Sequence, residues 1–286
     1  MRKQIYPALW FNANAKEAAE YYCTIFNDTA MKSESDYAVV FETSGQKFLC
    51  INGGPEFTPN PSISFFVLYE DKDELDKAWN KLAEGGKVLM PLDSYPWSQH
   101  YGWIQDKFNV SWQFYLGKMQ DVGQKFTPSL LFTGEQNGKA EEAINFYSSL
   151  FENSSISGIM KYTGEGDDIK GNIAHAQFTL GDNVFMAMDS SEPHQFNFNE
   201  GISLVIECKT QEEIDYYWER LSAVPEAEQC GWLKDKYGVA WQVVPEILEH
   251  LMEDPEKATR VAEAFMQMKK FDIQKLQEAY GELPKV

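Results

Sequence analysis

The sequence has few cysteines, few basic residues and no long apolar run. Its cysteines, Cys23, Cys50, Cys208 and Cys230, include no C-x-x-C pair, so there is no sign of a zinc knuckle, a redox motif or a disulfide framework. The apolar runs, such as residues 63–68, have the length of strands and predict no membrane-spanning helix. Because the start also lacks the apolar stretch of a signal peptide, we expect a cytoplasmic protein.

The charge balance is strongly acidic, with 25 basic against 44 acidic residues and a formal net charge of -19. Nucleic acids and anionic membranes are bound mainly through Lys and Arg, so we expect neither as a partner. Hydrophobic residues make up 43% of the 286 residues, which is enough to build a packed core. A chain of this length predicts two domains of about 100–200 residues each.

An internal repeat is the strongest signal in the sequence. Three blocks recur in the same order, with tryptophans at the same steps; the last contains Gly-Trp, Asp-Lys, Val and Trp-Gln in both copies. The pairs of blocks are residues 7–26 and 128–151, 63–82 and 202–221, and 102–113 and 231–242. The chain is therefore two diverged copies of one domain, predicted as residues 1–118 and 124–246.

Each copy has the pattern of two βαβββ halves. An apolar strand comes first (residues 5–11 and 126–132), and the helix after it carries Ala18, Tyr21, Tyr22 and Ile25 at helical spacing. The second half starts again with a strand at 62–69. We expect the two halves of one copy to form one curved mixed sheet, with helices outside and a concave face inside. The predicted class is α+β, with two tandem domains.

Capping signals mark several helix starts, and the end of the chain is predicted to be wholly helical. Thr210 with Glu213 forms a capping box, and Asp71 with Glu74 has the same spacing. Residues 247–286 carry apolar stripes at helical spacing, and Asp-Pro-Glu at 254–256 predicts a helix start within them. We expect this tail to pack against the sheet domains or a second subunit, which would make the protein a homo-oligomer.

The paired βαβββ halves and the recurring Trp-Gln ending resemble the glyoxalase/bleomycin-resistance/dioxygenase (vicinal oxygen chelate) superfamily. Within it, the chain is most similar to the PhnB-like branch, which is labelled 3-demethylubiquinone-9 3-methyltransferase. The residues that carry this resemblance are 173–176, 231–242 and 268–273. It implies a glyoxalase-like fold over nearly the whole chain, whereas members differ in function from metal-dependent lyases and dioxygenases to non-catalytic drug binders.

The methyltransferase label finds no support in the residues. No strand is followed by a glycine-rich turn and then by an acidic residue at the end of the next strand, the arrangement that would hold a nucleoside cofactor. The glycine pairs at 53–54 and 85–86 precede no predicted helix. We therefore interpret the label as an inherited name, and the sequence indicates no particular cofactor.

The metal ligands that the resemblance would imply are absent from both copies. Metal-binding members place His, Gln or Glu on the first and last strands of their halves. The matching positions here hold neutral residues in both copies: Tyr6 and Thr127, Ser62 and Gly201, and Gln113 and Gln242. Neutral amide and hydroxyl oxygens alone hold a transition metal poorly, so we predict no metal site of the usual kind.

His175 is the candidate catalytic residue. Along residues 173–180 the even positions are apolar, which leaves His175, Gln177 and Thr179 on the opposite, concave face. Copy one has no histidine there. A site in copy two would use His175 as a base or ligand, with Gln242 as its amide partner. The alternative is a histidine hydrogen-bonded within the sheet.

Two functions from different classes remain open. The first is a non-catalytic protein that buries an apolar or aromatic small molecule; the second is a glyoxalase-like lyase, isomerase or dioxygenase centred on His175. Absence of the metal triad favours binding. Besides the catalytic candidate, the residues expected to line the ligand are Gln242, Gln177, Trp232, Trp241, Gln113 and Trp103, although strand tryptophans are more often core residues.

Overall fold

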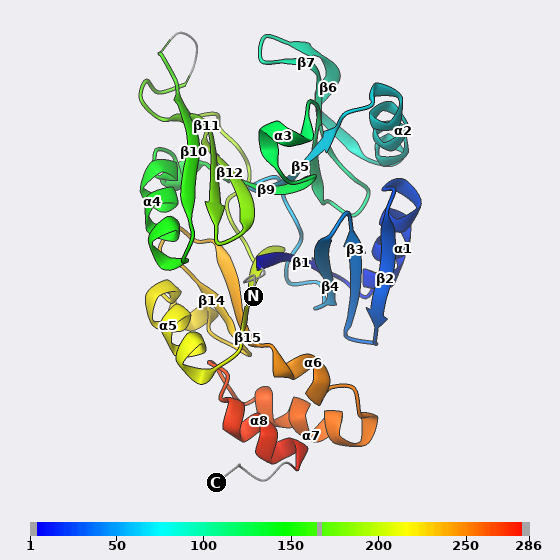
Figure 1. The fold of residues 1–286 in the computed structure, drawn as a ribbon, viewed down its shortest axis with the longest axis vertical. Helices are drawn as coiled ribbons and strands as arrows, with labels where there is room; N and C mark the ends of the chain where they lie inside the picture. Colours follow the sequence, from blue (N-terminus) through cyan, green and yellow to red (C-terminus); the bar gives the residue numbers. More distant parts are fainter. Residues whose placement is uncertain (1–4, 165–167, 282–286) are drawn as a thin grey trace. The chain divides into compact units, whose positions relative to one another are not determined.

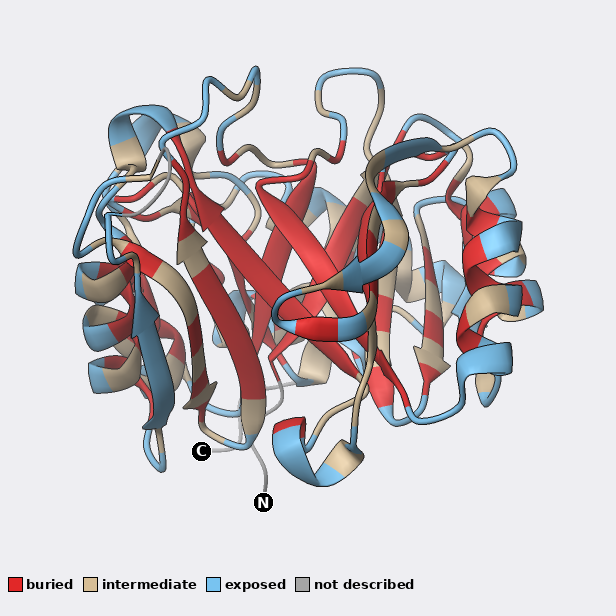
Figure 2. Ribbon diagram, turned by 90° about the horizontal axis from the view of Figure 1, so that it is seen from above, coloured by how far each residue is buried: buried red, intermediate tan, exposed pale blue. Residues whose placement is uncertain are grey.

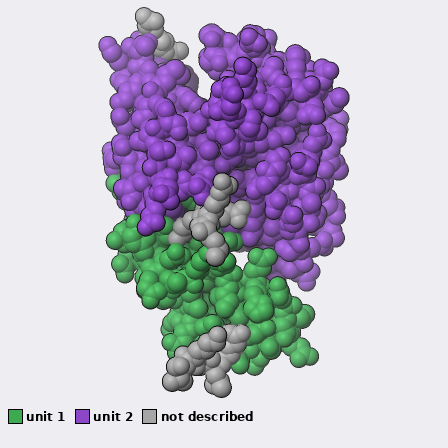
Figure 3. All heavy atoms as spheres, in the orientation of Figure 1, with its two compact units in different colours: residues 1, 3–5, 203–286 green, residues 2, 6–202 purple. Residues whose placement is uncertain are grey.

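The computed structural model describes residues 5–164 and 168–281 (Figure 1). It divides into two compact units, one of residues 6–202 and the other of the described residues from Ser203 onward together with Ile5 (Figure 3). Within the described residues, no helix combines the length and the apolar character that crossing a membrane requires.

The first half of copy one is a βαβββ module, as predicted. Strand β1 pairs in parallel with β4, and the sheet continues from β4 through antiparallel β3 to antiparallel β2. The helix α1 packs the face formed by Ala18, Ala19 and Tyr22 against these strands. The turn between β3 and β4 uses Ser44 and Gly45, both at positive φ. The elements are β1 (Ile5–Phe11), α1 (Ala15–Ile25), β2 (Thr29–Glu34), β3 (Ala38–Thr43) and β4 (Gln46–Asn52).

An eight-stranded sheet joins the second half of copy one to the first half of copy two. Its strand order is β10-β11-β12-β9-β5-β8-β7-β6. Copy one contributes β5 (Ile63–Tyr69), α2 (Lys72–Ala83), β6 (Lys87–Tyr95), β7 (Ser98–Gln105) and β8 (Ser111–Leu116). Copy two contributes β9 (Phe126–Phe132), the short η1 (Gly134–Gln136), α4 (Ala140–Leu150), β10 (Ser155–Lys161), β11 (Ile173–Leu180) and β12 (Asn183–Asp189).

The join between the copies is the antiparallel pair β5–β9, in which Ser64 faces Ser129 and Phe66 faces Thr127. We expected the two halves of one copy to share a sheet, whereas the four strands β1 to β4 of copy one belong to a different sheet from β5 to β8. The physical reason is that β5 and β9 each pair with a strand of their own module on one edge only. Pairing the two open edges satisfies backbone groups that burial would otherwise leave unbonded.

The core of copy one lies on the side of β5 and β8 that faces α1. Trp112 of β8 is fully buried among Tyr22 of α1, Phe26 at the C-cap of α1, and Phe65 of β5. Figure 2 shows buried residues along the strands and on the inner sides of the helices, whose outer sides are exposed. The opposite side of β5 and β8 carries a second set of buried side chains, among them Phe66 and Leu68.

The other unit contains the second half of copy two and the tail. Its strands pair in the order β14-β15-β13, and Thr210 caps α5 by accepting a hydrogen bond from the Glu213 amide, which confirms the predicted capping box. Pro255 opens α7 after the N-cap Asp254, as predicted. The elements are β13 (Ile202–Cys208), α5 (Gln211–Leu221), η2 (Pro225–Ala227), β14 (Trp232–Lys234), β15 (Ala240–Pro245), α6 (Ile247–Leu251), α7 (Pro255–Phe265) and α8 (Ile273–Tyr280).

The tail docks on this unit through the loop between α7 and α8. The amides of Cys230 and Gly231 donate to the carbonyls of Met268 and Lys269, at 2.8 and 2.7 Å. Phe271 is buried against Gly231, where an added Cβ would lie only 2.3 Å from its ring. Glycine is thus required at position 231 both by its φ of +81° and by this close approach.

Candidate functional site

The repeated Asp-Lys…Trp-Gln motif is largely a folding device. In copy one, Asp106 is buried and its Oδ1 accepts hydrogen bonds from the amides of Phe108 and Val110, which closes the turn before β8. Its Oδ2 accepts from Trp112 Nε1 at 2.8 Å and from the Tyr22 hydroxyl at 2.9 Å. Burial raises the pKa of this carboxyl to about 6, although the four donors act in the opposite direction.

Copy two repeats the arrangement. Asp235 accepts from the amides of Tyr237 and Val239 and from Trp241 Nε1, at 2.8 Å for the indole. Trp241, a predicted ligand-binding residue, is 0% exposed. Its described contacts are those of a core residue that fixes the turn before β15.

The face of the eight-stranded sheet that points away from α1 is covered by a short helix, α3 (Met119–Val122), which belongs to the segment between the copies (Figure 1). We call this the covered face. Buried apolar side chains from both copies and from α3 form one cluster on it: Phe66, Leu68, Tyr101, Val122, Val184 and Met186. The partly buried Met90, Tyr95, Trp103, Tyr115 and Met119 pack against that cluster.

Uncharged polar groups lie on the same face. Gln113 of β8 is buried; its Nε2 donates to Ser64 Oγ at 2.7 Å, and its Oε1 accepts from the Tyr101 hydroxyl at 2.7 Å. Trp103, opposite Gln113 across β7–β8, donates its indole N–H to Ser111 Oγ at 2.7 Å. The predicted residues Gln113 and Trp103 are thus neighbours on the covered face.

Thr127 supplies a buried polar atom without a partner. It pairs with Phe66 across β5–β9, so both side chains leave the sheet on the covered face. Thr127 is 0% exposed, and its Oγ1 has no hydrogen-bond partner in the part of the chain that the structure describes. An unsatisfied buried hydroxyl is rare because it costs about 1–3 kcal/mol.

His175 and Gln177 lie on β11, in the copy-two half of the sheet. Gln177 is opposite Met186 of the cluster, and its amide reaches the carbonyl of Asp121 in α3 at 3.4 Å. His175 is two residues away along the strand and therefore on the same face. It is partly buried, and burial lowers the pKa of its imidazole, which keeps the ring neutral at pH 7.

Gln242 and Trp232 belong to the other compact unit, so the predicted pairing of His175 with Gln242 joins residues of two different units. Within its own unit, Gln242 is buried and its Nε2 donates to Ser203 Oγ at 2.9 Å, which repeats the Gln113–Ser64 bond of copy one. Trp232 is opposite Gln242 across β14–β15 and partly buried. The amide that shares a strand face with His175 is that of Gln177, two residues along β11, whereas Gln113 lies on β8, four strands away in the order of the sheet.

The residues at the superfamily's metal positions do not fit a metal. On the covered face these positions hold Thr127, Gln113 and the Ser62–Ser64 segment, and the Gln113 oxygen already accepts the Tyr101 hydroxyl. Within residues 5–164 and 168–281, no group of three His, Cys, Asp or Glu side chains is arranged to hold a metal ion. A divalent ion there would lack both charge and imidazole ligands.

The remaining histidines lie outside this face. His100 Nε2 is 2.6 Å from Asp76 on α2, and His250 pairs with Glu253 on the tail. His194 Nε2 is 2.9 Å from Ser190 Oγ within the loop that follows β12. All three make local contacts that suffice to explain their positions.

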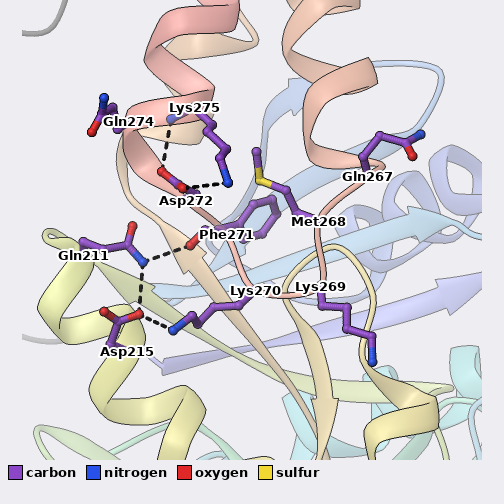
Figure 4. A pocket seen from close by; sticks show the side chains of 10 residues that line it. All are labelled: Gln211, Asp215, Gln267, Met268, Lys269, Lys270, Phe271, Asp272, Gln274 and Lys275. Carbon is purple, nitrogen blue, oxygen red and sulfur yellow. Dashed lines mark hydrogen bonds and ion pairs between the residues drawn. The ribbon is translucent and has the colours of Figure 1, made fainter.

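Two hollows are relevant to ligand binding. One, of about 450 Å³, lies beside α3 and is lined by the tip of the β6–β7 hairpin (residues 94–99), by 115–118 and by Gln120 and Asp121. The rings of Tyr95 and Trp97 stack there with their centroids 5.1 Å apart, and Trp97 is 58% exposed. The other, of about 670 Å³, is the crevice where the tail meets α5 (Figure 4).

The tail crevice is built from ion pairs and hydrogen bonds that hold the tail in place. Lys270 pairs with Asp215 at 2.5 Å, and Gln211 bridges Asp215 to the carbonyl of Phe271 (Figure 4). Lys275 pairs with Asp272 at 3.2 Å. Because these groups are engaged with each other, the crevice is a docking interface of the tail.

Sequence reasoning missed the part that α3 and Tyr101 play. The predicted domains end at residue 118 and begin again at 124, with no helix predicted between them, yet Met119 and Val122 stand three residues apart, the spacing of one helical face. Tyr101 occupies the position of Cys230 in copy two, so the repeat itself did not mark it as part of a shared site.

A family model and several solved structures match this chain. The model of the 3-demethylubiquinone-9 3-methyltransferase family matches residues 3–115 and 124–244. The PhnB protein of Bacillus cereus, which carries the same description provisionally, is 36% identical over 40% of this chain and 100% of its own, with a TM-score of 0.39. Glyoxalase I of Zea mays is 9% identical over 88% of this chain and 96% of its own, with a TM-score of 0.58. No curated protein matches the chain.

Proposed function

This chain belongs to the 3-demethylubiquinone-9 3-methyltransferase family, the PhnB-like branch with a glyoxalase-like fold, and from this premise we propose that it binds an uncharged, largely apolar small molecule. The proposed site comprises the hollow beside α3 and the covered face of the eight-stranded sheet. Its lining comes from the second half of copy one and the first half of copy two.

One observation carries the proposal: an apolar and aromatic wall surrounds a small set of uncharged polar groups. The wall includes Phe66, Leu68 and Met186, and the polar groups are Gln113, Tyr101 and the unpartnered hydroxyl of Thr127. Small-molecule sites in proteins have this composition, with a few polar groups that orient the ligand. A strongly charged ligand would find no counter-charge among those groups.

The proposal does not include methyl transfer. Nucleoside cofactors are held at the carboxyl ends of doubly wound parallel sheets, where a glycine-rich turn leads into a helix. In this chain the strand that follows each module's helix pairs antiparallel with its neighbour, as β10 does with β11 and β6 with β7. The family name therefore gives no support for that reaction here.

A second candidate is a glyoxalase-like lyase, isomerase or dioxygenase centred on His175. The observation in its favour is a neutral imidazole on the covered face, one position along the strand face from Gln177. A neutral imidazole is able to accept a proton from a bound substrate. The amide on the same strand face is that of Gln177, two residues along β11.

A matched pair of isosteric variants tests the binding site. N-phenyl-1-naphthylamine, a neutral apolar dye, is titrated into the wild type, Gln113→Glu and Gln242→Glu. Gln113→Glu keeps the acceptor for Tyr101 but adds a charge to the covered face, and we expect it to weaken the dye about tenfold, since desolvating a carboxylate is costly. Gln242→Glu should leave affinity unchanged. An effect of Gln242→Glu alone would move the site to the other unit, and no dye binding at all would contradict the proposal.

Elemental analysis separates the second candidate from the first. The wild type and His175→Ala are purified from cells supplied with Mn, Fe, Ni and Zn in turn. Near-stoichiometric metal that is lost in His175→Ala would favour a metalloenzyme, and it would contradict the conclusion that the residues on the covered face do not fit a metal. Equal, negligible metal in both proteins would leave binding as the better assignment.

A further inference from the structure

The short helix α3 has two different sides. Met119 and Val122 point to the covered face, where Val122 belongs to the buried cluster and Met119 packs against it. Gln120 and Asp121 are exposed and line the hollow of about 450 Å³. A single turn of helix thus forms the partition between an open hollow and a buried apolar surface.

Few interactions hold α3 in this position. Outside its own turn, the hydrogen bonds found among the described residues are Met119 N to Glu70 Oε1 at 2.8 Å and Gln177 Nε2 to the Asp121 carbonyl at 3.4 Å. The helix has four residues, and Lys118 at its start makes no side-chain cap. An isolated helix of one turn has almost no stability of its own, so its position depends on the burial of two side chains.

The segment after α3 is suited to act as a hinge. Gly123 is left-handed, with φ of +83°, and an added Cβ would contact nothing within 4 Å. The next residue, Gln124, is fixed, because its side chain bonds both the amide and the carbonyl of Val184 at the start of β12. Movement of α3 would therefore concentrate at Gly123 and leave β9 undisturbed.

We propose that α3 is a displaceable plug: it occupies the ligand site on the covered face, and the ligand binds there after α3 swings away from the sheet about Gly123. This inference rests on the proposed function and adds how the site opens and what it accepts. Moving the plug exposes Phe66, Leu68 and Met186 together with the Thr127 hydroxyl.

The groups that α3 leaves behind define the ligand class. The ligand replaces a methionine and a valine side chain, so it is apolar and without charge. It carries one hydrogen-bonding group that meets Thr127, the only described buried hydroxyl on this face without a partner. The exposed stack of Tyr95 and Trp97 at the hollow favours a planar aromatic portion in that ligand.

Hydrogen exchange with and without the dye tests the plug directly. Ligands ordinarily slow the exchange of the amides they cover, whereas a ligand that displaces α3 must speed exchange of residues 119–123. The amide of Gly123 is the best reporter, because it donates to the Met119 carbonyl at 2.7 Å when α3 is in place. We expect faster exchange in this segment on dye binding and slower exchange in β5 and β12.

Hinge variants provide a matched control. Gly123→Val strains the left-handed backbone, whereas Gly123→Asn tolerates it, and both add a side chain to open space. We expect Gly123→Val to raise dye affinity about tenfold and Gly123→Asn to have little effect. Val122→Ala removes two carbons from the plug and should also raise affinity about tenfold.

The outcomes distinguish this inference from the proposed function. Two results together would overturn the plug: dye binding makes residues 119–123 exchange more slowly, and all three variants bind the dye with wild-type affinity. Binding of the dye in the hollow would still stand. A Gly123→Val protein whose α3 exchanges freely but binds no dye overturns the proposed ligand site instead. Faster exchange in the wild type with tighter binding by Gly123→Val and Val122→Ala supports both.

Discussion

Replacing Thr127 by valine should make the protein more stable, although the substitution removes a hydrogen-bonding group from its interior. The Thr127 hydroxyl is fully buried and has no partner among the described residues. Leaving such a group unsatisfied costs about 1–3 kcal/mol, and valine has the same shape with a methyl group in place of the hydroxyl. We expect the free energy of unfolding to rise by about 1–2 kcal/mol.

Urea denaturation followed by tryptophan fluorescence measures this change, and an unchanged m value would show that only stability has moved. The control is Ser148→Ala on α4, because Ser148 Oγ is also buried without a partner in the described chain but lies outside the covered face. Both variants should be stabilised. Thr127→Val alone should weaken binding of the naphthylamine dye, by about two- to tenfold for one hydrogen bond.

A loss of stability of about 1 kcal/mol or more in Thr127→Val would refute this reasoning, because a loss of that size is what removing a satisfied hydrogen bond produces. Unchanged dye affinity together with higher stability would refute only the claim that the Thr127 hydroxyl contacts the ligand. In that case the hydroxyl would be a defect of packing and not a contact for the ligand.

Three further predictions concern the scaffold and its pH dependence. Asp106→Asn should lower the free energy of unfolding by about 2–4 kcal/mol, because an amide nitrogen would face two of the four donors that the carboxylate now accepts. Burial raises the pKa of Asp106 to about 6, so the shift stabilises the folded protein most at pH values below the ordinary pKa of 3.8, and this stabilisation is lost as the pH rises through 6. Urea titrations of the wild type at several pH values should show this slope in the free energy of unfolding, and those of Asp106→Asn should not. Phe271→Ala should destabilise the tail by about 3 kcal/mol and expose it to limited proteolysis, whereas Gln274→Ala on the surface of α8 should not. Burial lowers the pKa of His175, so wild-type stability should fall as pH drops below 6.5, and His175→Gln should fall less over the same range; equal curves would place that imidazole in solvent.

The fold could be predicted from the sequence because its signals are local. Apolar periodicity located the βαβββ halves, and residues near one another in the chain fixed the helix starts at Asp71, Thr210 and Asp254. The site was harder to predict. Members of the buried cluster on the covered face, such as Phe66 and Met186, come from different copies, and no pattern within one copy relates them.

The sequence by itself determined that two copies of one domain are present, that each consists of βαβββ halves, and which side chains alternate on the strands it located. Only the tertiary structure decided which halves combine. The open edges of β5 and β9 are made of backbone N–H and C=O groups, which are alike in every strand, so the choice of partner is not written in the residues of either edge. The same holds for α3, because a polar boundary segment becomes a cover only when two halves from different copies place an apolar surface beneath it.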